Sequence, residues 1–322
     1  MSRWSEAVPG AGPRPEGALP LAGFKGAWFD QVIGADDADV RARLSAARPA
    51  LCGLTLDRPR VMGILNVTPD SFSDGGDFDA HGAAVARAKV LAEDCDVIDI
   101  GGESTRPGAQ EVSVQEEIRR TVPVIEAIRA AGITTPISID TRKALVAEAA
   151  LDAGADIVND VSAFEFDPEL AELCAARDVP VCLMHAKGLP DTMQDNPTYE
   201  DVVGEVMVHL AERIDFAISK GVKRERIITD PGIGFGKTLE HNLTLLAHLT
   251  VFHDLGLPVL LGASRKRFIG AIGEAPEARD RVGGSLAVAL HGAARGMHIL
   301  RVHDTKQTAQ ALKLWAALSQ EG

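Results

Sequence analysis

The sequence has few cysteines, no long apolar run and a deficit of positive charge. Its four cysteines are scattered over 322 residues without a C-x-x-C pair. This spacing argues against a disulfide framework or a structural zinc site and indicates free thiols in a reducing compartment. No segment reaches the roughly 18 consecutive apolar residues that a membrane-spanning helix needs. We therefore expect a cytoplasmic protein.

Basic residues are outnumbered, with 33 Lys and Arg against 46 Asp and Glu, which gives a net charge of −13. A chain this acidic is a poor candidate for nonspecific binding to nucleic acid or to an anionic membrane. An anionic ligand would need a local cluster of positive charge. At the same time, a hydrophobic fraction of 46% supplies a sizeable core.

The amino-terminal part of the chain reads differently from the rest. Residues 1–20 hold four prolines and no apolar segment, which predicts a disordered tail rather than a signal peptide. Residues 21–60 form an expected extension, with a helix near 37–47 and a short strand near 50–56. We expect this extension to cover the bottom of the domain that follows.

From residue 61 to residue 322, short apolar runs alternate with stretches of helical spacing. Nearly continuous apolar runs are typical of parallel strands that are buried on both faces. The expected strands are 61–66, 96–101, 136–140, 156–160, 180–184, 226–230, 258–262 and 298–302. Eight such units favour an α/β fold of the TIM (β/α)8 barrel type, with a doubly wound open sheet as the alternative.

Polar residues stand at or just after the ends of these runs. They are Asn66, Glu103, Asp140, Asn159, His185, Asp230, Lys266 and His303. Because a parallel barrel collects the carboxyl ends of its strands on one face, residues distant in sequence meet there. This pattern predicts a polar pocket at the carboxyl-terminal mouth of the barrel.

The loops after the first two strands have turn-forming composition. ILNVTPDSFSDGG (64–76) carries Asp70, Phe72 and Asp74, and GGESTRPG (101–108) carries Thr105, Arg106 and Pro107 at its tip. Each could be an ordinary surface turn. Two such loops on neighbouring strands favour mobile lids over a ligand.

Asp140, Asn159 and Asp230 could each simply cap a helix. Three such groups in one mouth better suit a flat, donor-rich heterocycle, because an ionised carboxylate only accepts hydrogen bonds. A divalent metal site is the competing explanation.

Cationic residues gather after the last two strands. GASRKRFIG (262–270) contains Ser264, Arg265 and Lys266, while Arg301 and His303 share one face of their strand because they are two residues apart. Barrels commonly bind phosphate at this position. A solvated basic turn beside a core histidine is the alternative.

Two further motifs each allow two interpretations. GIGFGKT (232–238) lacks the spacing of a nucleotide-binding phosphate loop, so its glycines more plausibly bend the backbone and place Phe235 against a ligand. His185 is at least as compatible with a structural role as with a catalytic one. Met184 could pack on a flat ring or belong to the core.

Taken together, these motifs resemble the dihydropteroate synthase family of folate biosynthesis. The resemblance rests on ILNVTPDSFSDGG, IDIGGESTRPG, ISIDTRK, IVND, CLMHAKG, ITDPGIGFGKT, GASRKRFIG and ILRVHD, in this order, and it covers about residues 50–318. It implies that 6-hydroxymethyl-7,8-dihydropterin pyrophosphate condenses with 4-aminobenzoate, giving 7,8-dihydropteroate and pyrophosphate.

The resemblance also implies a role for each site residue. Pterin binding falls to Asp140, Asn159, Met184, Asp230, Phe235 and Lys266. Pyrophosphate binding falls to Asn66, Arg301 and His303, with Mg²⁺ bound near Asn66. Aminobenzoate binding falls to Phe72, Thr105, Pro107, Phe235 and Ser264. Catalytic roles fall to Asp74, Arg106 and Lys266. A homodimer through the outer helices near 240–318 is implied as well.

We further hypothesise that the C–O bond to pyrophosphate breaks first, with Asp74 stabilising the resulting cation. Two other functions compete with the synthase. A pterin-barrel methyltransferase would share the acidic and amide contacts but would not need Arg301, His303 and both lids. A catalytically silent pterin-binding module would show a broken lid or a lost cationic site, and neither change is present.

Overall fold

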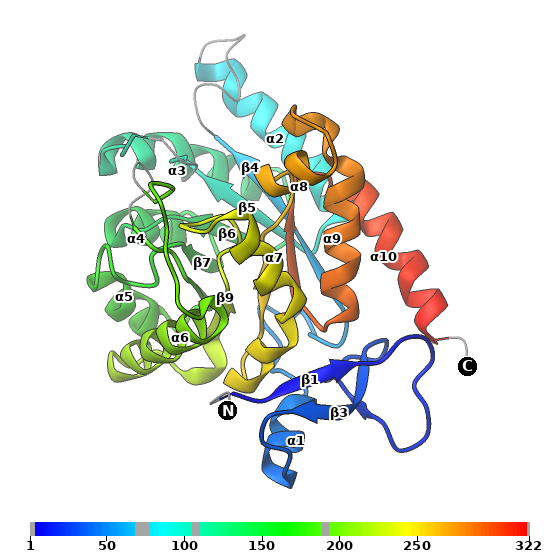
Figure 1. The fold of residues 1–322 in the computed structure, drawn as a ribbon. Helices are drawn as coiled ribbons and strands as arrows, with labels where there is room; N and C mark the ends of the chain where they lie inside the picture. Colours follow the sequence, from blue (N-terminus) through cyan, green and yellow to red (C-terminus); the bar gives the residue numbers. More distant parts are fainter. Residues whose placement is uncertain (1–3, 68–76, 105–109, 189–192, 321–322) are drawn as a thin grey trace.

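The computed structural model describes residues 4–67, 77–104, 110–188 and 193–320. A barrel of parallel strands surrounded by helices makes up most of the molecule, and a small sheet lies at one end (Figure 1). The barrel strands follow the order β10-β11-β4-β5-β6-β7-β8-β9, and each neighbouring pair is parallel. A parallel bridge between Thr229 and Val259 connects β9 to β10. The expected TIM barrel is therefore confirmed, and the open-sheet alternative is wrong.

The barrel strands are β4 (Arg60–Asn66), β5 (Val97–Gly101), β6 (Ile137–Asp140), β7 (Ile157–Asp160), β8 (Val181–Met184), β9 (Ile227–Asp230), β10 (Leu260–Leu261) and β11 (Ile299–Val302). The helices around them are α2 (Asp77–Asp94), α3 (Val114–Ala130), α4 (Ala144–Asp152), α5 (Glu169–Arg177), α6 (Val202–Ser219), α7 (Leu239–Ala247), α8 (Arg267–Ile272), α9 (Val282–Ala294) and α10 (Thr305–Gln320). Short 3-10 helices are η2 (Arg224–Arg226), η3 (Leu249–Leu255) and η4 (Ala278–Asp280).

Side-chain alternation divides the barrel interior into layers. At the amino-terminal end, a hydrophobic cluster takes one residue from each of seven strands: Met62, Val97, Ile157, Cys182, Ile228, Leu260 and Ile299. Because side chains two residues apart share a face, the next inward positions include Asp99, Asn159 and Arg301. The strands therefore close the bottom of the barrel with apolar groups and present polar groups toward its mouth.

The amino-terminal extension is ordered from residue 4 onward, so the expectation of a disordered tail over residues 1–20 is wrong for the part that is described. Strand β3 (Trp28–Ile33) pairs antiparallel with β1 (Glu6–Pro9) on one side and with β2 (Leu19–Pro20) on the other. Two of the four prolines, Pro9 and Pro20, end β1 and β2, where a missing N–H costs little. Helix α1 (Ala38–Ser45) confirms the helix expected near 37–47.

The extension packs against the amino-terminal end of the barrel (Figure 1). Asp254 of η3 accepts from the Ser5 backbone at 2.9 Å and from Arg43 Nε at 2.8 Å. Leu51 and Leu56 join the hydrophobic cluster that closes the barrel bottom. The strand expected near 50–56 is instead a tight turn with an isolated Leu51–Leu54 bridge, because Cys52 adopts a positive φ of 48°.

Across the described segments, no helix combines the length and apolar character needed to cross a membrane. Cys52, Cys95, Cys174 and Cys182 are all free, as their spacing predicted. Burial raises the pKa of Cys174 and of Cys95 to about 12 in each case. These thiols are therefore protonated and belong to the packing of the fold.

Candidate active site

Arg301 occupies the centre of the barrel mouth and contacts two carboxylates. Its Nε donates to Asp99 Oδ2 at 2.6 Å, and its Nη2 donates to Asp140 Oδ2 at 2.6 Å. Asp99 is fully buried, and Asp140 is 6% exposed. A guanidinium with a rigid fork of donors suits this bridging position, because each carboxylate only accepts.

Asp99 is the inward-facing residue that the sequence analysis missed. Besides Arg301, it accepts from Asn159 Nδ2, at 3.4 Å through Oδ1. Its position, two residues before Gly101 in the run VIDIG, carries a usable signal, since a lone acid in an apolar strand shares a face with every second residue. The carboxylate connects Arg301 to an expected pterin-binding residue.

Asp230 and Lys266 approach the same mouth from the other side. An ideal Cβ on Gly262 would lie 3.7 Å from Asp230 Oδ2 and 3.9 Å from Arg301 Cδ, so these two residues flank one small gap. Lys266 Nζ lies 4.2 Å from the centroid of the Phe235 ring and donates to the Ile233 carbonyl. The distant acidic and cationic groups therefore converge as expected.

Burial perturbs the charges of this mouth. It raises the pKa of Asp140 to about 7, although the nearby Arg301 opposes the rise. It lowers the pKa of Lys266 to about 7, although Asp230 opposes the fall. Burial also raises the pKa of Asp230. Groups that change charge near neutrality inside a shared mouth are typical of functional sites.

Asn66 and His303 complete the described rim. An ideal Cβ on Gly101 would lie 3.6 Å from Asn66 Oδ1 and 3.6 Å from Asp140 Cβ, so Asn66 adjoins the acidic part of the mouth. His303 contacts Ser264, with Nδ1 and Oγ separated by 3.1 Å. The structure thus brings His303, which is expected to bind pyrophosphate, next to Ser264, which is expected to bind aminobenzoate.

Arg265 does not add free charge to this rim. Its Nε donates to Asp304 Oδ2 at 2.9 Å, and its backbone N–H donates to Ser285 Oγ at 2.9 Å. The expectation that Arg265 strengthens the cationic cluster is therefore wrong. It anchors the loop after β10 to the residue that precedes α10.

Glu103 is also committed to the scaffold. It accepts from Arg142 Nη2 at 2.7 Å and from Lys143 Nζ at 2.6 Å, and all three side chains are buried. Lys143 Nζ also donates to Glu117 Oε2 at 2.7 Å. Glu103 further accepts from the Val112 backbone at 2.8 Å, which joins the two ends of the loop that follows β5.

Several expected residues lie outside the described part of the chain. They are Asp70, Phe72, Asp74, Thr105, Arg106 and Pro107. Their roles stay predictions.

Met184 and His185 lie on opposite sides of the barrel wall. Met184 is 3% exposed, and its Cγ lies 3.3 Å from the place where a Cβ on Gly232 would stand, while the His185 ring packs edge-on against His209 of α6 with centroids 4.8 Å apart. His185 therefore faces the helix layer, as a structural role requires.

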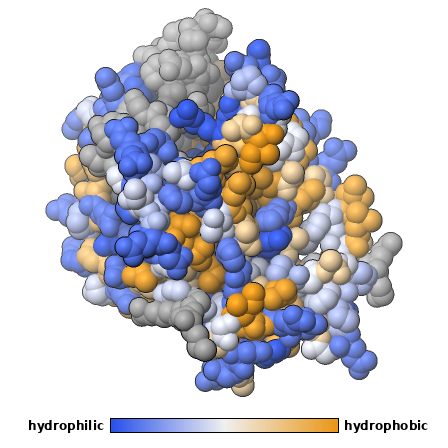
Figure 2. All heavy atoms as spheres, in the orientation of Figure 1, coloured by the Kyte–Doolittle hydropathy of each residue, from blue (hydrophilic) through white to orange (hydrophobic). Residues whose placement is uncertain are grey.

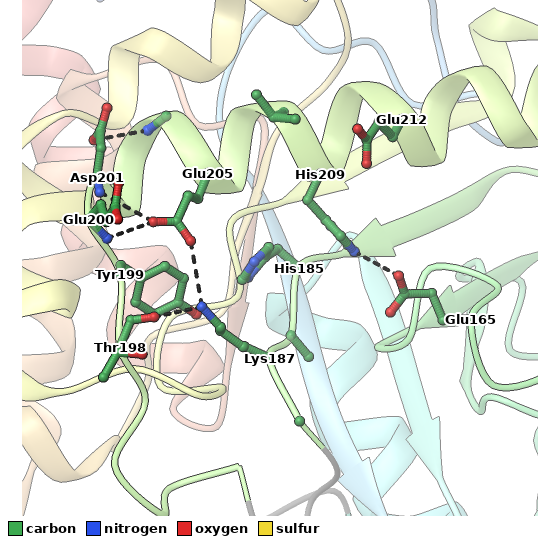
Figure 3. Close-up of a pocket in the computed structure, with 14 residues that line it drawn as sticks. Glu165, His185, Lys187, Thr198, Tyr199, Glu200, Asp201, Glu205, His209 and Glu212 are labelled. Atoms are coloured by element: carbon green, nitrogen blue, oxygen red, sulfur yellow. Dashed lines mark hydrogen bonds and ion pairs between the residues drawn. The ribbon is translucent and has the colours of Figure 1, made fainter.

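Outside the barrel wall, a hollow of about 1050 Å³ extends between the loop after β8 and helix α6. Figure 3 shows Glu205 turned toward Lys187 and Glu165 turned toward His209. The carboxylates that line this hollow are paired with cations or exposed to solvent, and none of them belongs to the barrel mouth. We therefore assign the chemistry to the mouth, where charges are buried.

The family model that matches this chain is described as a pterin binding enzyme and spans residues 62–303. The dihydropteroate synthase of a Synechocystis strain is 48% identical over 262 residues, covering 81% of this chain and 90% of that protein. The chain belongs to the dihydropteroate synthase family.

Solved structures of the family agree with this fold. A Xanthomonas albilineans dihydropteroate synthase with 4-aminobenzoic acid superposes with a TM-score of 0.79 and 50% identity, covering 84% of this chain and 96% of that one. The enzyme from the same organism in complex with 7,8-dihydropteroate gives a TM-score of 0.75 and 46% identity, covering 84% and 97%. The amino-terminal sheet lies before the segment that the family model matches.

Proposed function

We propose that this protein condenses 6-hydroxymethyl-7,8-dihydropterin pyrophosphate with 4-aminobenzoate to give 7,8-dihydropteroate and pyrophosphate. The observation that carries the proposal is the mouth itself, where Arg301 bridges two buried carboxylates beside Asp230 and Lys266. Membership of the family supplies the reaction, and the relatives with bound aminobenzoate and dihydropteroate support both substrates.

The pterin would lie in the deeper part of the mouth. Asp140, Asn159 and Asp230 offer hydrogen-bonding oxygens to the N–H groups of a flat heterocycle, and the Lys266 ammonium offers donors to its acceptors. Met184 and Phe235 supply apolar surface for the ring faces. Asp230 already accepts from the Gly232 backbone at 2.7 Å through Oδ1, which holds its carboxylate in place.

Pyrophosphate would lie nearer the rim, against Arg301, His303 and Asn66. No group of three or more His, Cys, Asp and Glu side chains suited to a metal occurs in the described ranges. The amide oxygen of Asn66 nevertheless fits Mg²⁺, which prefers hard oxygen ligands and commonly binds through one or two protein groups plus substrate phosphates. Bound there, Mg²⁺ would supply positive charge to the leaving pyrophosphate.

The protein's own groups account for much of the proposed chemistry. Arg301 donates to the charge that develops on pyrophosphate as the C–O bond breaks. The aromatic amine of 4-aminobenzoate is neutral and nucleophilic, so no strong protein base is required. Ser264 and Phe235 are the described residues proposed to contact the aminobenzoate, and His303 Nδ1 lies 3.1 Å from Ser264 Oγ.

A homodimer is part of the proposal. Large apolar side chains are exposed on the outer helices, including Leu243 of α7, Ile272 of α8 and Leu314 of α10 at 42%, 56% and 63%. Figure 2 shows apolar groups collecting over α7 and α8 on the face toward the viewer. Such a surface favours burial against a second copy of the chain.

The decisive experiment incubates the purified protein with both substrates, with and without Mg²⁺, and measures dihydropteroate. We expect product that depends on Mg²⁺ and falls about 100-fold or more in Arg301→Gln, since a buried charged hydrogen-bond network is lost. Arg295→Gln is the matched control, because Arg295 precedes β11 at the opposite end of the barrel. Pterin binding without product formation in the wild-type protein would contradict the proposal.

A further inference from the structure

Lys237 is a buried lysine that has no role in the reaction proposed above. It belongs to the GIGFGKT segment after β9 and is only 3% exposed. Its Nζ donates to the Gly232 carbonyl at 2.9 Å, to the Phe235 carbonyl at 3.0 Å and, at 3.4 Å, to the His185 carbonyl, and it lies 2.9 Å from His185 Nδ1. The loop therefore folds around an amine of its own chain.

The glycines of this loop permit that folding. Gly232 and Gly236 have φ values of 67° and 61°, a region that side chains disfavour. A Cβ on Gly232 would lie 1.8 Å from the His185 carbonyl oxygen, and one on Gly236 would lie 2.2 Å from the Lys187 carbonyl oxygen. Phosphate loops turn backbone N–H groups inward. This loop instead turns carbonyl groups toward the Lys237 amine.

The two shorter carbonyl bonds, to Gly232 and Phe235, can form whichever charge state the amine has. An ammonium has three N–H donors, enough for two carbonyls and the imidazole. A neutral amine keeps two donors for the carbonyls, and its lone pair can accept from His185 in the other ring tautomer. Burial lowers the pKa of Lys237 well below its ordinary value, and burial with this neighbour lowers the pKa of His185 to about 2.

The held loop in turn places two groups of the proposed site. Phe235 presents its ring 4.2 Å from Lys266 Nζ, and the Ile233 carbonyl accepts from the same ammonium. A Cβ on Gly234 would lie 2.9 Å from Lys266 Cδ, so the loop backbone packs directly on the Lys266 stem. Lys237 contacts the same backbone through the Gly232 and Phe235 carbonyls and reaches the His185 ring.

We propose that Lys237 is a positioning residue, which rests on the proposed function and acts through Phe235. By fixing the Phe235 carbonyl, it sets the ring that contacts 4-aminobenzoate and the Lys266 ammonium. Lys237 touches no reacting atom. Its removal leaves the mouth's charged residues in place and releases the loop that positions Phe235.

The test is a double-mutant cycle of Lys237→Met and Phe235→Leu. Each single variant is expected to lower kcat/KM for 4-aminobenzoate about tenfold, the size of effect expected when one weak set of contacts is lost. The double variant should also lose about tenfold, because the first change already removes what the second would remove. A loss of about 100-fold would mean that the two residues act independently and would overturn the proposal, as would wild-type kinetics in Lys237→Met.

Lys143→Met is the matched control, since Lys143 is equally buried at the same end of the barrel and bonds Glu103 and Glu117. Its effect should multiply with that of Phe235→Leu. Hydrogen exchange of the 231–238 backbone supplies a readout besides activity, and it should accelerate in Lys237→Met while that of β6 is unchanged. Unchanged exchange at 231–238 would contradict the proposal.

If Lys237→Met does not fold, Lys237→Gln takes its place in the cycle, because its amide keeps two donors. A partial loss that is still non-multiplicative with Phe235→Leu is expected, and a multiplicative loss counts against the proposal. Lack of product in the wild-type protein would instead refute the proposed function, so the two failures are distinguishable.

Discussion

Among single residues, Arg301 determines the electrostatics of the mouth. It is the cation between Asp99 and Asp140, and these neighbouring carboxylates raise its own pKa against the effect of burial. Removing one partner of such a network would leave a buried charge uncompensated. The two carboxylates therefore keep this guanidinium charged inside the mouth.

Asp140 should impose an acidic limit on activity. Its pKa is raised to about 7, so it is mostly ionised, and an acceptor through both oxygens, only above this pH. As pH falls below 7, protonation removes the negative charge and turns one oxygen into a donor, and kcat/KM for the pterin substrate should fall toward about tenfold per pH unit. Lys266, whose pKa is lowered to about 7, should cause a decline on the alkaline side.

The measurement is kcat/KM for the pterin substrate between pH 5.5 and about 8.5. Asp140→Asn should lower the maximum about 10- to 100-fold and abolish the acidic limb. Asp152→Asn, at an exposed ion pair with Arg177, should keep the wild-type profile. An unchanged acidic limb in Asp140→Asn would assign that limb to another group.

Turning to whole elements, the loop after β9 depends on glycine for two separable reasons. Gly232 has a positive φ, and its neighbour, the His185 carbonyl, leaves no room for a Cβ. Gly132, after α3, has a similar φ of 77° but nothing within 4 Å of its Cβ position. Comparing substitutions at Gly132 and Gly232 therefore separates the cost of backbone strain from the cost of steric overlap.

Gly132→Ala should lower the free energy of unfolding by about 1 kcal/mol, the ordinary cost of a left-handed alanine. Gly232→Ala should lower it by at least about 3 kcal/mol, since the loop must also move away from His185. Denaturant unfolding monitored by circular dichroism measures both. Equal losses would show that the approach of the two loops does not contribute.

On the scale of the whole molecule, the extension and the site occupy opposite ends of one barrel. Phe24 is 1% exposed in the extension and packs edge-on against His298, just before β11, with centroids 5.1 Å apart. The mouth residues stand at the other ends of the strands. Stability contributed by the extension should thus be separable from catalysis.

Phe24→Ala should lower the free energy of unfolding by about 3–5 kcal/mol, the usual cost of deleting a buried phenylalanine. The Tm should fall by several degrees while kcat stays within about twofold at temperatures well below it. Thermal unfolding and steady-state kinetics on one preparation test both statements. A proportionate loss of kcat at low temperature would link the extension to the site.

Local pattern predicted much of this structure. Seven of the eight expected strands contain the observed barrel strand, and the eighth, 61–66, misses only Arg60 at the start of β4. Asp99 was not predicted as a site residue because the sequence analysis considered only polar residues at or just after the ends of the apolar runs, and Asp99 lies inside its run. The structure of residues 4–20 was not predicted because the residues that they contact, such as Asp254, are remote in sequence.

The sequence by itself predicted eight strand–helix units, favoured a barrel over an open sheet and placed polar groups at the carboxyl ends of the strands, and its motifs resembled the family. These depend on neighbours a few residues apart, which the printed sequence displays directly. Only the tertiary structure decided that Arg301 pairs with Asp99 and Asp140 and that Arg265 is neutralised by Asp304. Charge pairing depends on distances of a few ångströms between segments up to 202 residues apart, and no local pattern contains them.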